Sequence, residues 1–232
     1  MDWSQSVCTK TKFEKGILIF MSNNNLKSRK YLERILILNL NTLQILFAVV
    51  MGVVGVFLFL FLFPGGAITT AMHQVLNLPG PGAGIGLIFG PFIIILSLLT
   101  YNSICKHGVI FITCLVFGLF HSILTPIVYP DVKTVGSLGP IYFRVLAVIL
   151  VGIALEICIF LLKNRKDIIK YLISAGISNI ILLSFYWVAI FPYNKGIIKI
   201  EDIPILLGIT IIAAIILGGL VPLGVKRLVC KN

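Results

Sequence analysis

The residues best suited to chemistry in this sequence are polar and aromatic side chains near one end of its apolar segments. His121 and Arg144 would lie at a similar depth there, and an imidazole with a guanidinium can bind an anion or stack on a planar ring. We predict a pocket for a planar or anionic small molecule formed by these two residues with Tyr142, Tyr129, Tyr186, His73, Gly82 and Gly84. The alternative is an aromatic belt, since Tyr and Trp gather at any bilayer interface, and we favour the belt for Trp187 and Tyr193.

Glu156 is the sole carboxylate deep within an apolar segment. It follows Arg144 by twelve residues, which is about 18 Å along a helix, so these two side chains cannot pair. We expect its partner to be His107, Lys106 or Lys163. A structural hydrogen bond is favoured over a proton or ion relay, because no chain of other acids accompanies it.

The sequence lacks the residue patterns of common catalytic and metal sites. It contains no His-Glu-x-x-His, no Gly-x-Ser-x-Gly and no phosphate-binding Gly-Lys-Ser/Thr loop. Its five cysteines show no Cys-x-x-Cys spacing, which argues against both a zinc site and a disulfide framework. We therefore expect no enzymatic activity, no cofactor and no metal.

The composition indicates whether water or lipid surrounds the helices that carry these residues. Of 232 residues, 59% are apolar and only 12% are charged, about half the usual charged share of a soluble domain. This is the composition of an integral membrane protein. Six segments are long enough to cross the hydrocarbon as helices, which predicts an all-α, polytopic bundle with spans at about 43–63, 84–101, 109–128, 141–162, 169–191 and 203–225.

The basic residues predict the orientation of this bundle. Fifteen of the nineteen Lys and Arg residues fall in the segments 1–42, 102–108, 163–170 and 226–232. Because positively charged loops stay in the cytoplasm, we expect both termini there and a multi-pass protein of the cell membrane. Because the basic residues lie at the ends of the predicted spans, they argue against nucleic-acid binding despite the net charge of +11.

The chain is predicted to divide into a basic tail, 1–42, and a transmembrane domain, 43–228. In the tail, residues 26–38 suit an amphipathic helix lying on the inner leaflet, or a charge cluster that only orients the first span. In the domain, glycine and proline crowd the entrance to the second span, where exposed backbone could approach a ligand or a neighbouring helix, or form a tight turn. Small residues also repeat four apart, at Ala48 and Gly52 and at Ala214 and Gly218, which favours close helix packing or docking of a partner subunit.

In layout, residues 40–228 resemble the substrate-capturing S component of energy-coupling factor transporters. The shared features are six spans, cytoplasmic ends, a small-residue stripe in the first helix, a long connection after it and a Gly-Pro-rich entrance to the second. The resemblance implies binding of a vitamin or vitamin precursor beneath a cap formed by residues 64–83. It also implies a separate coupling subunit with its own ATPases, which would dock at Ala48 and Gly52.

Two other functions remain open from the residues alone. The chain could be a small accessory or structural membrane protein without a ligand, if its outer polar residues only contact lipid headgroups. It could also be a stand-alone ion-coupled carrier, if Glu156 and His121 face one continuous cavity.

Overall fold

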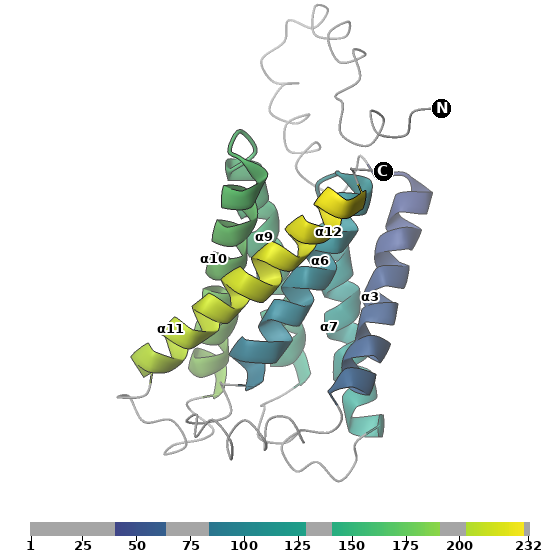
Figure 1. The fold of residues 1–232 in the computed structure, drawn as a ribbon. Coiled ribbons are helices and arrows are strands. Elements are labelled where there is room, and N and C mark those ends of the chain that lie inside the picture. Colours follow the sequence, from purple (N-terminus) through teal and green to yellow (C-terminus); the bar gives the residue numbers. More distant parts are fainter. Residues whose placement is uncertain (1–39, 64–83, 129–140, 191–202, 230–232) are drawn as a thin grey trace, which may run out of the picture.

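The computed structural model describes residues 40–63, 84–128, 141–190 and 203–229, which form helices and no strand. Six helical spans in this part of the chain are long and apolar enough to cross a membrane (Figure 1). The predicted all-α polytopic fold with six spans is therefore confirmed. The spans are α3 (Thr42–Leu62), η2 with α6 (Ile85–Phe89 and Gly90–Ile104), α7 (Val109–Val128), α9 (Ile141–Leu161), α10 (Asp167–Ile190), and α11, η4 and α12 (Ile203–Ala213, Ala214–Leu220 and Val221–Val229).

The alternating direction of the spans gives the bundle two different ends. At the short-turn end, tight turns join α6 to α7 and α9 to α10, α3 begins and α12 ends (top of Figure 1). At the long-connection end, the described chain stops at residues 63, 128 and 190 and resumes at 84, 141 and 203. Of the described Lys and Arg residues, Arg144 alone lies at the long-connection end, and the short-turn end holds Lys106, Lys163, Arg165, Lys166, Lys170, Lys226 and Arg227.

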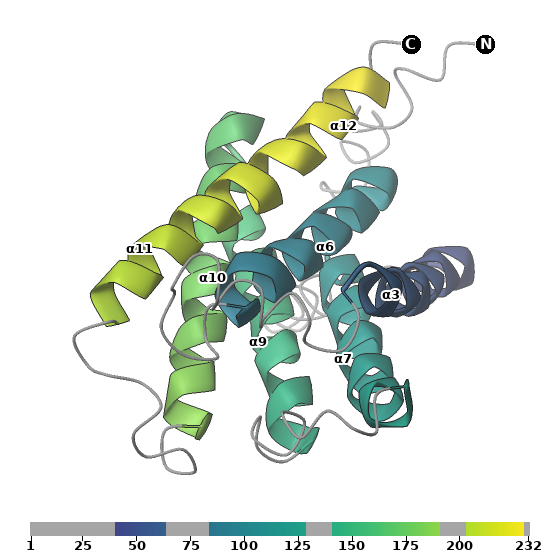
Figure 2. The same ribbon diagram turned by 60° about the horizontal axis from the view of Figure 1, so that its bottom comes forward.

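Helix α6 lies at the centre of the bundle. It contacts α3, α7, α9, α10, η4 and α12, whereas the outer helices contact one another in the order α3, α7, α9, α10 and η4 (Figure 2). In the α6 span 56% of the most apolar stretch is buried inside the protein, compared with 28% in α3. The second span therefore serves as the core, while the first presents much of its surface to lipid.

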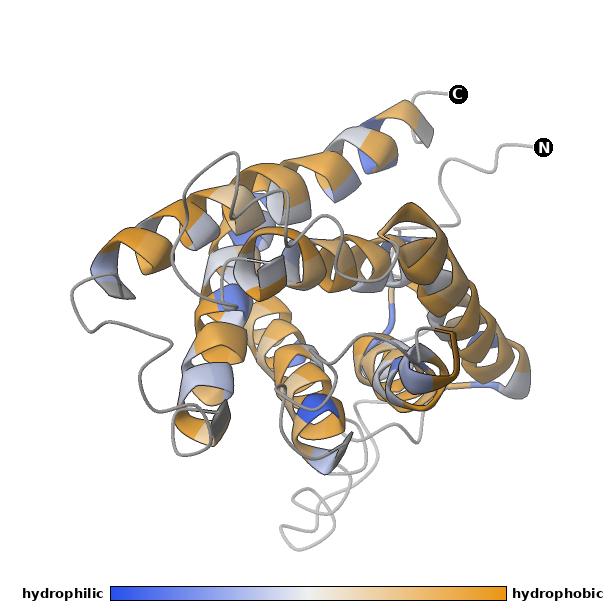
Figure 3. Cartoon of the chain, turned by 90° about the horizontal axis from the view of Figure 1, so that it is seen from below, coloured by the Kyte–Doolittle hydropathy of each residue, from blue (hydrophilic) through white to orange (hydrophobic). Residues whose placement is uncertain are grey.

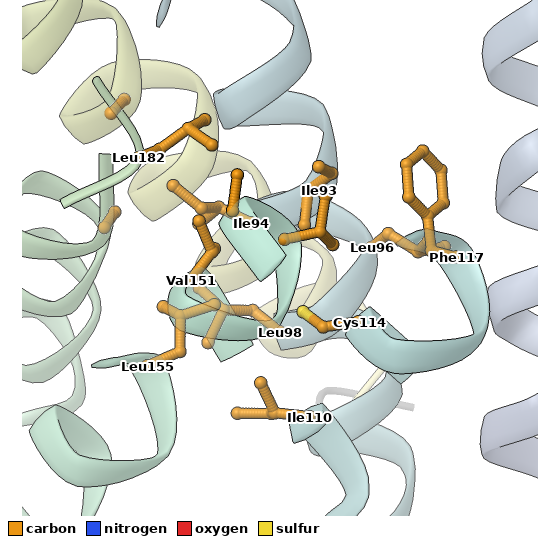
Figure 4. Packing of buried hydrophobic residues seen from close by; sticks show 14 of the residues in the cluster. Ile93, Ile94, Leu96, Leu98, Ile110, Cys114, Phe117, Val151, Leu155 and Leu182 are labelled. Carbon is orange, nitrogen blue, oxygen red and sulfur yellow. The ribbon is translucent and has the colours of Figure 1, made fainter. Parts of the chain in front are cut away.

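The core is built from aliphatic side chains that α6 sends towards its neighbours. Ile93, Ile94 and Leu98 are fully buried and pack near Val151 and Leu155 of α9 (Figure 4). Outside this core most helical positions remain apolar, as Figure 3 shows. Because lipid tails are as apolar as these side chains, the outward faces need no polar covering.

A π-helical turn, η2, leads into α6, and Asn179 of α10 stabilises it. The Gly90 N–H donates to the Ile85 carbonyl, five residues back, as a π-turn requires. The Asn179 Nδ2 donates to the carbonyls of Gly86 (3.0 Å) and Thr210 (2.8 Å), linking η2, α10 and α11. The glycine-rich entrance thus approaches neighbouring helices closely, which was one of its predicted roles.

Helix α3 begins at a capping box and packs through its small residues. The side chains of Asn41 and Gln44 each accept a hydrogen bond from the backbone N–H of the other, at 2.9 and 3.1 Å. Ala48 is fully buried, and a Cβ on Gly52 would lie 2.9 Å from Val116 Cβ of α7. The stripe that was predicted either to pack within the chain or to dock a partner therefore packs against α7, and neither residue faces outward.

Enlarging Ala48 should destabilise the protein. We expect Ala48→Leu to lower the free energy of unfolding by about 1–3 kcal/mol, because the added carbons would be forced between α3 and α7. Val50→Leu is the matched control on the exposed face of the same helix. Unfolding of detergent-solubilised protein followed by circular dichroism measures both variants, and equal stabilities would contradict close packing of α3 on α7.

Candidate functional site

An aromatic cluster surrounds His121 near the long-connection end. The imidazole stacks on Phe117, one turn earlier in α7, with centroids 5.6 Å apart and an interplanar angle of 8°. Phe89 of η2 lies 5.0 Å from it and Phe59 of α3 lies 5.4 Å from it, so three helices hold the ring. No described residue forms a hydrogen bond with the His121 ring nitrogens. Within the described chain, these nitrogens could therefore still bind a ligand.

Arg144 brings a positive charge to this cluster. It lies in the first turn of α9, is partly buried, and is close enough to His121 and to the Tyr186 hydroxyl for electrostatic interaction with each. Arginine side chains stay protonated in proteins, so this guanidinium brings a fixed positive charge. The arrangement thus places a permanent cation beside a ring stack.

Buried hydroxyl groups complete the cluster. Tyr186 of α10 is 7% exposed and Ser122 of α7 is 1% exposed, and neither hydroxyl finds a hydrogen-bond partner among the described residues. Leaving such groups unpaired costs free energy, so each is expected to bind a partner from beyond the described chain.

Close contact between α7 and α9 sets the position of the Ser122 hydroxyl. A Cβ on Gly118 would lie 3.2 Å from Val148 Cβ, so the two backbones approach closely at that level. Ser122 follows Gly118 by four residues and therefore lies on the same face of α7, one turn nearer the long-connection end. Arg144 precedes Val148 by four residues, which places it at the corresponding level of α9.

The structure brings together only part of the predicted pocket. His121, Arg144 and Tyr186 gather as described, whereas Tyr142 is 62% exposed and its ring is tilted by 48° against that of its neighbour Phe143. Gly84 is the N-cap of η2. His73, Gly82 and Tyr129 lie outside the described residues.

Several members of the cluster were not predicted. Ser122 and the rings of Phe59, Phe89 and Phe117 are absent from the predicted pocket. The spacing of four between Phe117 and His121 was a usable signal, because residues four apart share a helix face. Phe59 and Phe89 carried no such signal, since their helices are apolar on every side.

Glu156 forms a separate site at the short-turn end, where it caps α7. Its Oε1 accepts hydrogen bonds from the backbone N–H groups of Gly108 (2.7 Å) and Ile110 (3.1 Å), and its Oε2 lies 3.3 Å from His107 Nδ1. The carboxylate satisfies amides that begin a helix and complements the positive end of its dipole. The expected structural hydrogen bond, with His107 as one partner, is thus present.

No family model, curated protein or solved structure matches this chain. Within the described ranges, no three His, Cys, Asp or Glu side chains gather in a way that could hold a metal ion. What the aromatic cluster offers is a cation, flat ring faces and several hydrogen-bond donors. These groups suit a ligand that is planar, carries acceptor atoms and is negatively charged.

Proposed function

We propose that this protein is the substrate-capturing subunit of an uptake transporter in the cell membrane, and that it binds a small planar anion at the aromatic cluster. The observation that carries the proposal is the position of Arg144 beside the His121 ring stack, at the end where the other described Lys and Arg residues do not lie. A guanidinium beside aromatic rings can bind a planar anion through its charge and through ring contact together.

The proposed orientation places the long-connection end outside the cell. Seven of the eight described basic residues lie at the opposite end, and retained positive charge marks the cytoplasmic side. A ligand from outside would then meet Arg144 first. It would pass next to the rings about one helical turn deeper.

The resemblance to S components further implies that the ligand is vitamin-like and that a coupling subunit with ATPases drives its uptake. Ala48 and Gly52 are buried against α7, so such a subunit would meet another surface. An exposed apolar face of α3 is available, formed by Leu43, Leu46, Phe47, Val50, Val54, Phe57 and Phe61. Lipid contact explains this face equally well, so it identifies no partner.

The structure offers no support for an ion-coupled carrier that uses Glu156 and His121 together. Glu156 binds the start of α7, and His121 lies eleven residues beyond Ile110, about 17 Å along that helix. Cys114 and Phe117, between these levels, are fully buried in the core. The two side chains therefore belong to separate sites.

A thermal-shift screen tests the proposed function. Detergent-purified protein is heated with B-vitamins and their pyrimidine or thiazole precursors, including nicotinate and nicotinamide as a matched anionic and neutral pair. We expect stabilisation by a planar anion and a smaller effect of its neutral analogue. A flat response to the whole panel would favour an accessory membrane protein without a ligand.

Replacing Arg144 should weaken binding of any ligand that the screen finds. We expect Arg144→Gln to raise the dissociation constant by about tenfold or more, because it removes a partly desolvated cation from the anion. Tyr142→Ala, two positions from Arg144 in sequence but exposed, is the matched control and should bind as the native protein does. Titration calorimetry measures both, and equal affinity of Arg144→Gln and native protein would place the pocket elsewhere.

A further inference from the structure

A charged pocket lies at the short-turn end, far from the aromatic cluster. It has a volume of about 270 Å³ and is lined by Lys166, Asp167, Ile168, Leu223, Lys226 and Arg227. The pocket joins the first turn of α10 to the last turn of α12. Three cations and one carboxylate give its lining a net positive charge.

Asp167 and Tyr171 contact two lysines here, Lys226 in the pocket lining and Lys170 next to it. Lys170 Nζ lies 2.7 Å from Asp167 Oδ1, and Lys226 Nζ lies 2.8 Å from Asp167 Oδ2, so the carboxylate bridges α10 and α12. Both ammonium groups also lie over the buried Tyr171 ring, at 5.3 and 6.0 Å. The single carboxylate is therefore fully engaged.

Hydrogen bonds near the pocket connect the helices that carry its lining with α6. The Tyr171 hydroxyl donates to Asn102 Oδ1, and Asn102 Nδ2 donates to the Pro222 carbonyl at 3.1 Å. These contacts tie α6, α10 and α12 together. The helix ends that carry the pocket are thus held together before an anion enters it.

Lys166 and Arg227 supply charge that the described protein does not neutralise. Both are exposed, and neither forms an ion pair with Asp167 or Glu156, the two carboxylates of the described residues. The start of α10 adds the positive end of a long helix dipole. An anion here would meet two uncommitted cations at the rim and the bound Lys226 within.

Apolar residues continue from the charges onto the surface of the bundle. Ile168 and Leu223 line the pocket itself, and near them in sequence are the exposed side chains of Ile169 in α10, Leu220 in η4, and Val221 and Val225 in α12. A free phosphate would use only the cations. An anionic lipid would use both parts, with its phosphate at the charges and its acyl chains along the apolar residues.

We propose that this pocket binds the phosphate headgroup of an anionic phospholipid. The site lies at the opposite end of the bundle from Arg144, and it requires no particular transport substrate. Its position in the terminal turns of two spans matches the depth at which headgroups lie. Bound there, the lipid would join α10 to α12 beside the ion pairs of Asp167.

Native mass spectrometry of the full chain tests this proposal. The protein is titrated with phosphatidylglycerol and with phosphatidylcholine of the same acyl chains. We expect one phosphatidylglycerol to bind preferentially, and the double variant Lys166→Gln with Arg227→Gln to weaken it on the order of tenfold. Lys163→Gln with Arg165→Gln is the matched control, since it removes the same charge at the same end without altering the pocket lining.

Three outcomes would overturn the assignment. If both double variants bound phosphatidylglycerol equally weakly, the lipid would be attracted by the overall positive charge of this end and not by the pocket. If the two lipids bound equally well, the phosphatidylglycerol headgroup would not be recognised. Competition by glycerol 3-phosphate or inorganic phosphate at the concentration of the lipid would show that the pocket takes a soluble phosphate. None of these results depends on the ligand of the aromatic cluster.

Discussion

Gly90→Ala should destabilise the protein by about 1–3 kcal/mol, even though alanine is the better helix former. A Cβ at this position would overlap Asn179 Oδ1 and lie 2.9 Å from Leu182 Cδ2. Asn179 cannot move away freely, since its amide donates to the carbonyls of Gly86 and Thr210. The cost should therefore appear as a lowered free energy of unfolding, measured in mixed detergent micelles.

A double-mutant cycle makes this prediction specific. Asn179→Ala alone removes two hydrogen bonds and should also destabilise, but it vacates the space that the alanine methyl needs. The combined variant should therefore lose less stability than the two single changes added together. Gly208→Ala and Gly224→Ala are matched controls, because a Cβ at either position meets nothing within 4 Å. The contact between residue 90 and Asn179 would be refuted if the two losses of stability were strictly additive. It would also be refuted if Gly90→Ala lowered the stability no more than these controls do.

The second large effect is expected at Glu156. Glu156→Ala should cost about 2–4 kcal/mol, because it leaves the amides of Gly108 and Ile110 without the acceptor that caps α7. Side-chain burial strengthens the effect, since the carboxylate is only 14% exposed and water replaces it poorly. Thermal unfolding in detergent should show a lower midpoint.

Two further variants separate capping from charge. Glu156→Gln keeps an oxygen at the same place and should retain much of the stability, since its amide carbonyl can accept the same hydrogen bonds. His107→Ala removes only the weaker contact at 3.3 Å and should cost least. If alanine and glutamine variants were equally unstable, the charge rather than the cap would be the stabilising element.

The span positions could be predicted because the bilayer imposes a minimum length on any apolar helix. The segments predicted at 109–128 and 141–162 correspond to Val109–Val128 and Ile141–Leu161. Glycine, proline and charge marked their ends. Similar reasoning identified His107 as one candidate partner of Glu156, since a buried carboxylate needs a donor.

The lateral arrangement of the helices could not be predicted in the same way. In a helix that is apolar on every side, periodicity does not distinguish a face that meets lipid from one that meets protein. Hence the central position of α6, the ring cage around His121 and the π-turn at Gly86 were not foreseen. The role of Asn179 depends on carbonyls 93 and 31 residues away in sequence, which no local pattern reveals.

The central position of α6 has a consequence for biosynthesis. This span and α10 are the least apolar of the six, and α6 leaves the ribosome well before α10 and η4, which cover it. Until α10 follows, α3, α7 and α9 are the only described helices that have been made and that contact α6. The core of the bundle can therefore form completely only late in synthesis, when Asn179 of α10 and the last span pack against the second span.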